Sequence, residues 1–91
     1  MKILSIFGTR PEAIKLAPII KKMKHNEKIT LFSCVTAQHR HILDQVLRTF
    51  DIKPEYDLDL MTKNQDLNYL AQGILKEVSK VLVKVSPDYI L

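Results

Sequence analysis

Residues 2–24 read KILSIFGTRPEAIKLAPIIKKMK, and the fold class is predicted mainly from this segment. The apolar run 2–7 ends at Gly8, which is typical of a central parallel strand that is covered on both faces. Residues 12–24 are mostly apolar with a narrow polar arc, so they predict a helix that is otherwise buried and is bent at Pro18. A strand, a tight loop and a helix form the first unit of an α/β sheet.

The rest of the chain continues this alternation of strand and helix. Residues 29–35 have the length and the β-branched and aromatic content of a second strand, and residues 39–50 and 65–85 place apolar side chains at helical spacing. Residues 56–60 predict a short edge strand or an extended connection, and residues 89–91 begin another apolar run. The sequence therefore predicts an α/β fold with a three-layer, Rossmann-like parallel sheet, whose strand-end loops converge on one ligand-binding edge.

The loop after the first strand carries several signals for the start of a helix. Gly8 permits a sharp turn. Thr9 and Glu12 have the spacing of a capping box, in which the glutamate carboxylate reaches back to the backbone N–H of the cap residue. Pro11 suits the first turn, where its missing N–H would have no partner. We therefore expect a helix whose N-terminus lies at the carboxyl edge of the sheet.

Arg10 and Lys15 make this helix start a candidate anion-binding site. A helix N-terminus offers unpaired N–H groups and a partial positive charge, and both favour a phosphate. Arg10 adds a planar guanidinium suited to bidentate contact, and Lys15 adds a compact charge one turn further on. The residues alone leave a structural alternative open, in which Arg10 pairs with a carboxylate and Lys15 pairs with Glu12 on the surface.

A second polar segment, residues 36–41 (TAQHRH), follows the second predicted strand and should face the same edge. His39 or His41 could act as a general base there, and Arg40 could meet an anion. The alternative is that both histidines are simple hydrogen-bonding residues at a helix start. Two histidines at this spacing, without a supporting carboxylate or cysteine, do not predict a metal site.

Other polar side chains carry weaker signals. Asp57 and Asp59 lie in the ambiguous segment and receive no catalytic role. Gln65 and Asp66 either cap the long helix or contact a ligand. The single Cys34 lies in a strand that looks buried, so we expect a structural thiol rather than a nucleophile.

The bulk properties narrow the range of partners. The formal net charge is +4, but the lysines are spread among helix faces and no aromatic platform accompanies them, which argues against nucleic-acid binding. The apolar run at the N-terminus is too short for a signal peptide or a membrane span. We therefore expect a globular, cytoplasmic protein with a small anionic ligand, and neither a nucleic-acid nor a membrane partner.

Residues 7–18, 36–40 and 43–47, together with Pro87 and Asp88, resemble the non-hydrolysing UDP-N-acetylglucosamine 2-epimerases of bacteria. The three segments read FGTRPEAIKLAP, TAQHR and LDQVL, and their order, spacing and contexts match the family over essentially the whole chain. Family members have two Rossmann-type domains that face each other across a cleft, in the arrangement called GT-B, and they commonly form homodimers. The resemblance implies that residues 1–91 are a fragment, a partial N-terminal domain without the C-terminal domain.

The resemblance also implies a reaction. Family members interconvert UDP-GlcNAc and UDP-ManNAc by inversion at C2 of the sugar, through anti elimination of UDP and its re-addition to the glycal intermediate, and they need no nicotinamide or metal cofactor. Arg10 and Lys15 match family positions that contact the nucleotide-sugar. The family's acid/base residues lie beyond Leu91, so we expect no catalytic residue within this chain and no activity from the chain alone.

Three further positions match an activator site, which is a second UDP-GlcNAc site in some bacterial family members. Gln38 and Gln65 keep the family's residue type, whereas His41 replaces a residue that is more commonly glutamine or acidic. A histidine changes its charge near neutral pH, so we expect this replacement to alter activator affinity or its pH response.

Alternative functions stay open at this point. A nucleotide-sugar glycosyltransferase or a hydrolysing epimerase has the same two-domain architecture, and a fold alone does not fix a function. The other alternative is a non-catalytic interaction or binding module made of this fragment alone. Saturable binding to an unrelated protein with no effect of nucleotide would favour an interaction module.

Overall fold

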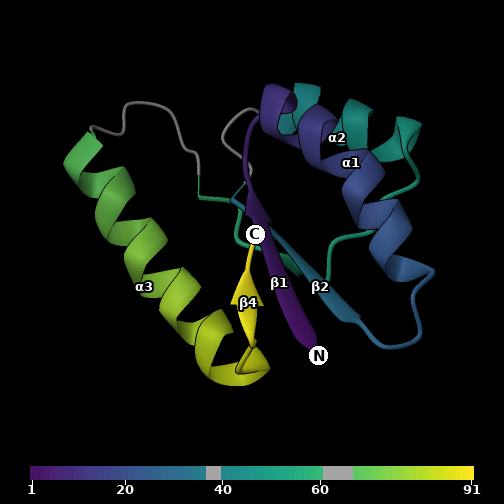
Figure 1. The fold of residues 1–91 in the computed structure, drawn as a ribbon. Coiled ribbons are helices and arrows are strands. Elements are labelled where there is room, and N and C mark those ends of the chain that lie inside the picture. The colour runs from purple at the N-terminus through teal and green to yellow at the C-terminus, as the bar shows by residue number, and fades with distance from the viewer. Residues whose placement is uncertain (37–39, 61–66) are drawn as a thin grey trace.

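The computed structural model describes residues 1–36, 40–60 and 67–91 (Figure 1). Strands and helices alternate along the chain. In order they are β1 (Lys2–Phe7), α1 (Arg10–Lys24), β2 (Thr30–Val35), α2 (Arg40–Thr49), β3 (Tyr56–Asp57), α3 (Leu67–Val85) and β4 (Tyr89–Ile90). None of the helices described is long and apolar enough to cross a membrane.

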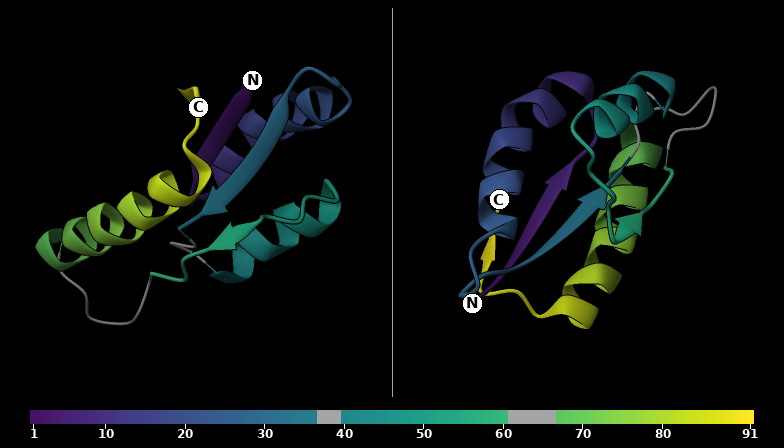
Figure 2. Two further views of the ribbon diagram at one scale, coloured as in Figure 1. Left: turned by 90° about the horizontal axis from the view of Figure 1, so that it is seen from below. Right: turned by 90° about the vertical axis from the view of Figure 1, so that its right-hand side faces the viewer.

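The strands form one sheet of four in the order β3-β2-β1-β4, and every pair is parallel. β1 is central and pairs with β2 along its whole length, from Lys2 opposite Thr30 to Phe7 opposite Val35. Helices α1 and α2 lie on one side of the sheet and α3 on the other (Figures 1 and 2). The predicted α/β fold with a parallel sheet is therefore confirmed.

Because strand side chains alternate between faces, the sheet buries two separate cores. Phe7 and Val35 belong to the larger cluster, together with the inner sides of α1 and α2. Leu4 and Cys34, on the opposite face of the same two strands, belong to the second cluster, with Val81 of α3 among its members. A strand buried on both faces needs apolar side chains at nearly every position, which is why four of the six residues of β1 are apolar: Ile3, Leu4, Ile6 and Phe7.

One polar pair interrupts the apolar face toward α1 and α2. Ser5 and Ser33 are register partners on adjacent strands, both are fully buried, and neither hydroxyl has a hydrogen-bond partner in the part of the chain that the structure describes. Ala13 and Ala17 are the fully buried alanines of α1. Small side chains on a helix and on a sheet allow the two to approach closely.

Helix α1 differs from its sequence-based prediction in one respect. The helix continues through Pro18, but only Ala13, Ala17 and Ile20 are buried. Ile14 and Ile19 are 43% and 45% exposed, so the expectation that all apolar residues of this helix are buried is wrong. Helical spacing identifies apolar positions but does not show how far the neighbouring helix extends over them.

The segment that the sequence left ambiguous forms a minimal edge strand. β3 pairs with β2 through Tyr56 and Asp57 only. Just before it, Glu55 Oε2 accepts the backbone N–H of Ser33 at 2.6 Å. The carboxylate therefore takes the place of a strand partner where β3 is too short to supply one.

Hydrogen bonds from Asp88, which follows Pro87, connect the start of β4 to the beginning of β1. Asp88 Oδ2 accepts the backbone N–H of Lys2 at 2.8 Å, and the Asp88 N–H donates to the Lys2 carbonyl at 2.8 Å. The Lys2 ammonium also approaches the Val85 carbonyl at 3.5 Å. The two hydrogen bonds between Lys2 and Asp88 precede the register pair in which Ile3 lies opposite Tyr89.

Replacing Asp88 should loosen this junction. We expect Asp88→Ala to remove one acceptor and to lower the free energy of unfolding by about 1 kcal/mol, with faster exchange of the Lys2 amide hydrogen. Asp88→Asn is the matched control, because its amide oxygen can still accept the same bond. Equal exchange rates in the alanine variant and the unsubstituted chain would contradict this assignment.

Candidate functional site

The site begins at the end of β1, where Glu12 folds back over the loop. Its Oε2 atom accepts the backbone N–H of Gly8 at 2.8 Å and that of Thr9 at 3.1 Å. Thr9 is the cap residue, with an extended backbone (φ −120°, ψ 162°), and its carbonyl accepts the N–H of Ala13 at 3.0 Å. One carboxylate oxygen thus fixes two consecutive peptide groups at the point where the chain turns from strand to helix.

Gly8 has a different role from the one its residue type suggests. It is buried at the end of β1, and its φ is not positive. The tight turn therefore does not require the conformational freedom of glycine. Its N–H is one of the two that Glu12 accepts, so what matters here is a buried peptide whose donor is satisfied by a nearby carboxylate.

Arg10 and Lys15 are presented to solvent on α1. Arg10 is the first residue of the helix, followed by Pro11, and Lys15 lies in its second turn. Both side chains are exposed, and neither forms a hydrogen bond or ion pair with any residue that the structure describes. The alternative in which Lys15 pairs with Glu12 on the surface is therefore not seen among the described residues. The Glu12 carboxylate is bonded instead to the backbone N–H groups of the loop.

This geometry changes how an anion would be held. The Gly8 and Thr9 amides are already occupied by Glu12, so they are not available to a ligand in this conformation. What remains at the helix start is the partial positive charge of the first turn and the two cationic side chains. The site therefore presents long, flexible cations to an anion instead of a nest of backbone amides.

The end of β2 lies beside this loop. Thr36 is buried, its N–H donates to the Phe7 carbonyl at 3.0 Å, and its carbonyl accepts the Leu60 N–H at 3.0 Å. The ends of β1 and β2 are thus tied together at the carboxyl edge. Residues 37–39 and 61–66, which include the predicted ligand positions Gln38, His39 and Gln65, lie outside the described residues.

His41 is described, as the second residue of α2. It is exposed and borders a shallow cavity of about 430 Å³ along that helix. The other residues around this cavity are Asp44, Leu47, Arg48 and Ile52. Neither Arg10 nor Lys15 lines it, so the cavity does not join His41 to the predicted phosphate site.

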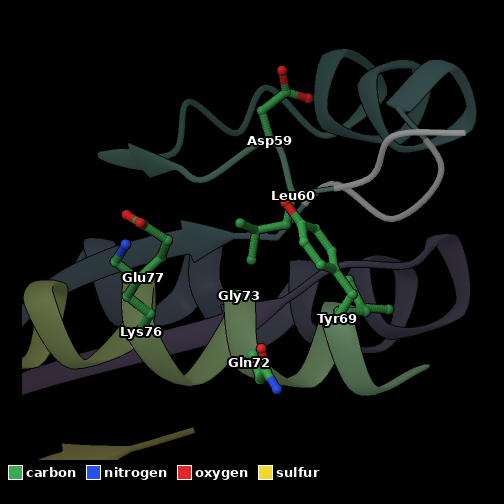
Figure 3. A pocket seen from close by; sticks show the side chains of 8 residues that line it. Asp59, Leu60, Tyr69, Gln72, Gly73, Lys76 and Glu77 are labelled. Atoms are coloured by element: carbon green, nitrogen blue, oxygen red, sulfur yellow. The ribbon is translucent and has the colours of Figure 1, made fainter. Parts of the chain in front are cut away.

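A second cavity was not predicted from the sequence. It has a volume of about 390 Å³ and lies between residues 59–60 and the first half of α3, with Tyr69, Gly73 and Lys76 among its lining. Leu60 points down toward Gly73 in the close view (Figure 3). Its two walls come from an irregular segment and a helix, and no periodicity in the sequence would bring them together.

The described residues offer no metal centre. No group of three or more histidine, cysteine, aspartate or glutamate side chains gathers in a way that could hold a metal ion within residues 1–36, 40–60 and 67–91. The candidate site therefore rests on Arg10 and Lys15 at the start of α1.

Comparison with known proteins extends over almost the whole chain. Residues 21–91 match the family model described as UDP-N-acetylglucosamine 2-epimerase. The UDP-N-acetylglucosamine 2-epimerase of Yersinia pestis is 50% identical over 91 residues, which is 100% of this chain and 24% of the relative. This chain belongs to the UDP-N-acetylglucosamine 2-epimerase family.

Solved structures agree with this family assignment. The UDP-GlcNAc 2-epimerase from Neisseria meningitidis bound to UDP-GlcNAc superposes with a TM-score of 0.93 at 48% identity, covering 99% of this chain and 24% of that one. The S. aureus MnaA–UDP co-structure gives a TM-score of 0.91 at 44% identity, covering 98% and 23%. The chain thus spans 24% of the length of the curated family members it matches.

In this epimerase-family chain Cys34 lies away from the candidate site. It is fully buried and belongs to the core cluster under α3. Burial, together with the smaller effect of the negative charge of Asp57, raises the pKa of the Cys34 thiol to about 11. A neutral, inaccessible thiol is a poor nucleophile, which fits a packing role.

The raised pKa of Cys34 predicts a loss of stability at high pH. The unfolded thiol ionises near 9.0 and the folded thiol near 11, so its contribution is fully present below pH 9.0 and is lost as the pH rises toward 11. We expect the free energy of unfolding to fall more steeply over this range in the unsubstituted chain than in Cys34→Ala. Identical slopes, or rapid alkylation of the folded chain at pH 8, would contradict the burial argument.

Proposed function

We propose that this protein interconverts UDP-GlcNAc and UDP-ManNAc by inversion at C2 of the sugar, and that residues 1–91 supply part of its nucleotide-sugar site. The observation that carries the proposal is the pair Arg10 and Lys15, exposed at a helix start on the carboxyl edge of a parallel sheet, in a chain of this epimerase family. A related enzyme was solved with UDP-GlcNAc and another with UDP. Ligands of open α/β sheets bind at this edge.

The role of the two cations is electrostatic. In the proposed reaction the proton at C2 is removed, the C1–O bond breaks with its electrons going to the departing UDP, and a glycal is left. UDP then adds back to C1 while C2 is protonated on the opposite face. Negative charge grows on the diphosphate as it leaves, so Arg10 and Lys15 held beside it would lower the barrier.

The acid and base that move the C2 proton are assigned to no residue of this chain. We therefore expect residues 1–91 alone to be catalytically inactive. We further propose that they form part of the N-terminal Rossmann-like domain of a two-domain, GT-B-type enzyme that works as a cytoplasmic homodimer. The proposal that residues 1–91 are part of a larger enzyme is supported by their length, because they cover 24% of the curated relatives.

The activator site is a separate part of the proposal. Gln38, His41 and Gln65 would line it, with His41 standing at the start of α2 and exposed. His41 replaces a residue that is more commonly glutamine or acidic at this position in the family, so we expect the strength of activation by UDP-GlcNAc to depend on this side chain.

A chimeric enzyme tests the proposed function directly. Residues 1–91 would replace the matching 91 residues of the Neisseria meningitidis enzyme, with which they share 48% identity. We expect the chimera to convert UDP-GlcNAc to UDP-ManNAc. Arg10→Ala should lower its kcat/KM by about 100-fold and Lys15→Ala by about 10-fold, because each removes a charged donor to the leaving group.

The matched control is Lys24→Ala, which removes an exposed cation from the last turn of the same helix. It should leave kcat/KM unchanged. Full activity of the Arg10→Ala and Lys15→Ala chimeras would remove the basis of the proposal. Release of free ManNAc would instead indicate a hydrolysing epimerase, and transfer of the sugar to an acceptor would indicate a glycosyltransferase.

A further inference from the structure

The Glu12 carboxylate lies within the proposed anion-binding site, yet it carries the same sign of charge as the ligand. It is two residues from Arg10 and three from Lys15 on α1. A free carboxylate there would repel a diphosphate. Its position therefore needs a reason that outweighs the repulsion.

The hydrogen bonds provide that reason. Both bonds from the loop, at 2.8 Å from Gly8 and 3.1 Å from Thr9, end on the single atom Oε2. The two donors are consecutive peptide groups, and the next residue is Arg10. Fixing these peptides fixes the backbone from which the Arg10 side chain leaves.

We propose that Glu12 is a positioning residue of the UDP-binding site. Its carboxylate holds the Gly8–Thr9 turn so that Arg10 projects at the carboxyl edge of the sheet, and it closes the two amides to the ligand. The diphosphate is then contacted by the Arg10 and Lys15 side chains. This inference rests on the proposed function, because it takes the diphosphate of UDP as the anion.

Loss of the Glu12 carboxylate would free the loop at Gly8, the residue whose backbone has the widest range of allowed conformations. Gly8 is buried, so without Glu12 its N–H would have to find water or another acceptor. Glycine has no β-carbon and can adopt many backbone conformations, so the turn would spread over several of them. Arg10 would then have to be ordered when UDP binds, and affinity would fall.

A different role would give the opposite result. The carboxylate could serve as an internal substitute for a phosphate, occupying the amides only until UDP displaces it. In that case removal of the carboxylate would expose two donors and strengthen binding. The sign of the change in UDP affinity therefore separates positioning from substitution.

Substitutions at Glu12 can separate geometry from charge. Because both bonds end on one oxygen, the single carbonyl oxygen of Glu12→Gln can accept both without any negative charge. Glu12→Asp keeps the charge, but its side chain is one methylene shorter. Glu12→Ala loses both the negative charge and the hydrogen-bond acceptor. Glu55→Ala is the matched control, because it removes a carboxylate that also accepts a backbone N–H, that of Ser33 in the middle of β2.

The experiment uses the 91-residue chain with UDP as the probe. Exchange of the Gly8 and Thr9 amide hydrogens and the Kd for UDP are measured for each variant. We expect Glu12→Gln to keep slow exchange and to bind UDP as tightly as the unsubstituted chain or up to about threefold more tightly. Glu12→Ala and Glu12→Asp should exchange faster and bind about fivefold or more weakly, while Glu55→Ala keeps its affinity.

Two outcomes would overturn the proposal. One is an unchanged or tighter Kd in Glu12→Ala, and the other is unchanged exchange of Gly8 and Thr9 in that variant. Failure of the proposed function looks different, since the Arg10→Ala and Lys15→Ala chimeras with the Neisseria meningitidis enzyme would then keep full kcat/KM. The exchange rates would still decide in that case whether Glu12 holds the loop.

Discussion

Both ends of β1 are held by carboxylates that accept backbone N–H groups, and the remaining structure depends on this strand. At its beginning Asp88 bonds to Lys2, and just beyond its end Glu12 bonds to Gly8 and Thr9. Between these points β1 pairs with β2 on one side and β4 on the other. A central strand fixed at both ends determines where α1 begins, and therefore where Arg10 is presented.

The same bonds shape the electrostatics of the molecule. The formal charge is +4, from 14 basic and 10 acidic residues. Glu12, Glu55 and Asp88 are engaged with backbone N–H groups of the sheet or its loop. Arg10 and Lys15 are exposed and unpaired among the described residues, so the carboxylates bonded to the backbone do not neutralise these two cations through ion pairs.

The elements of the fold that the sequence predicts are those determined by residues close together in the chain. β1 follows from a short, mostly apolar run, and the start of α1 follows from Thr9 and Glu12, which are three positions apart. The bond from Asp88 to Lys2 joins residues 86 apart, and that from Glu55 to Ser33 joins residues 22 apart, so neither has a local signal. The exposure of Ile14 and Ile19 and the cavity beside Leu60 depend in the same way on what neighbouring elements cover.

The central claim is that the diphosphate of a nucleotide-sugar binds at the start of α1, beside a loop that Glu12 keeps closed. The most direct measurement is an NMR titration of the isotopically labelled chain with UDP. We expect saturable shifts of the Arg10 and Lys15 side-chain signals, with the Gly8 and Thr9 amides still protected at saturation. Shifts confined to Tyr69 and Lys76, in the cavity beside α3, would contradict it.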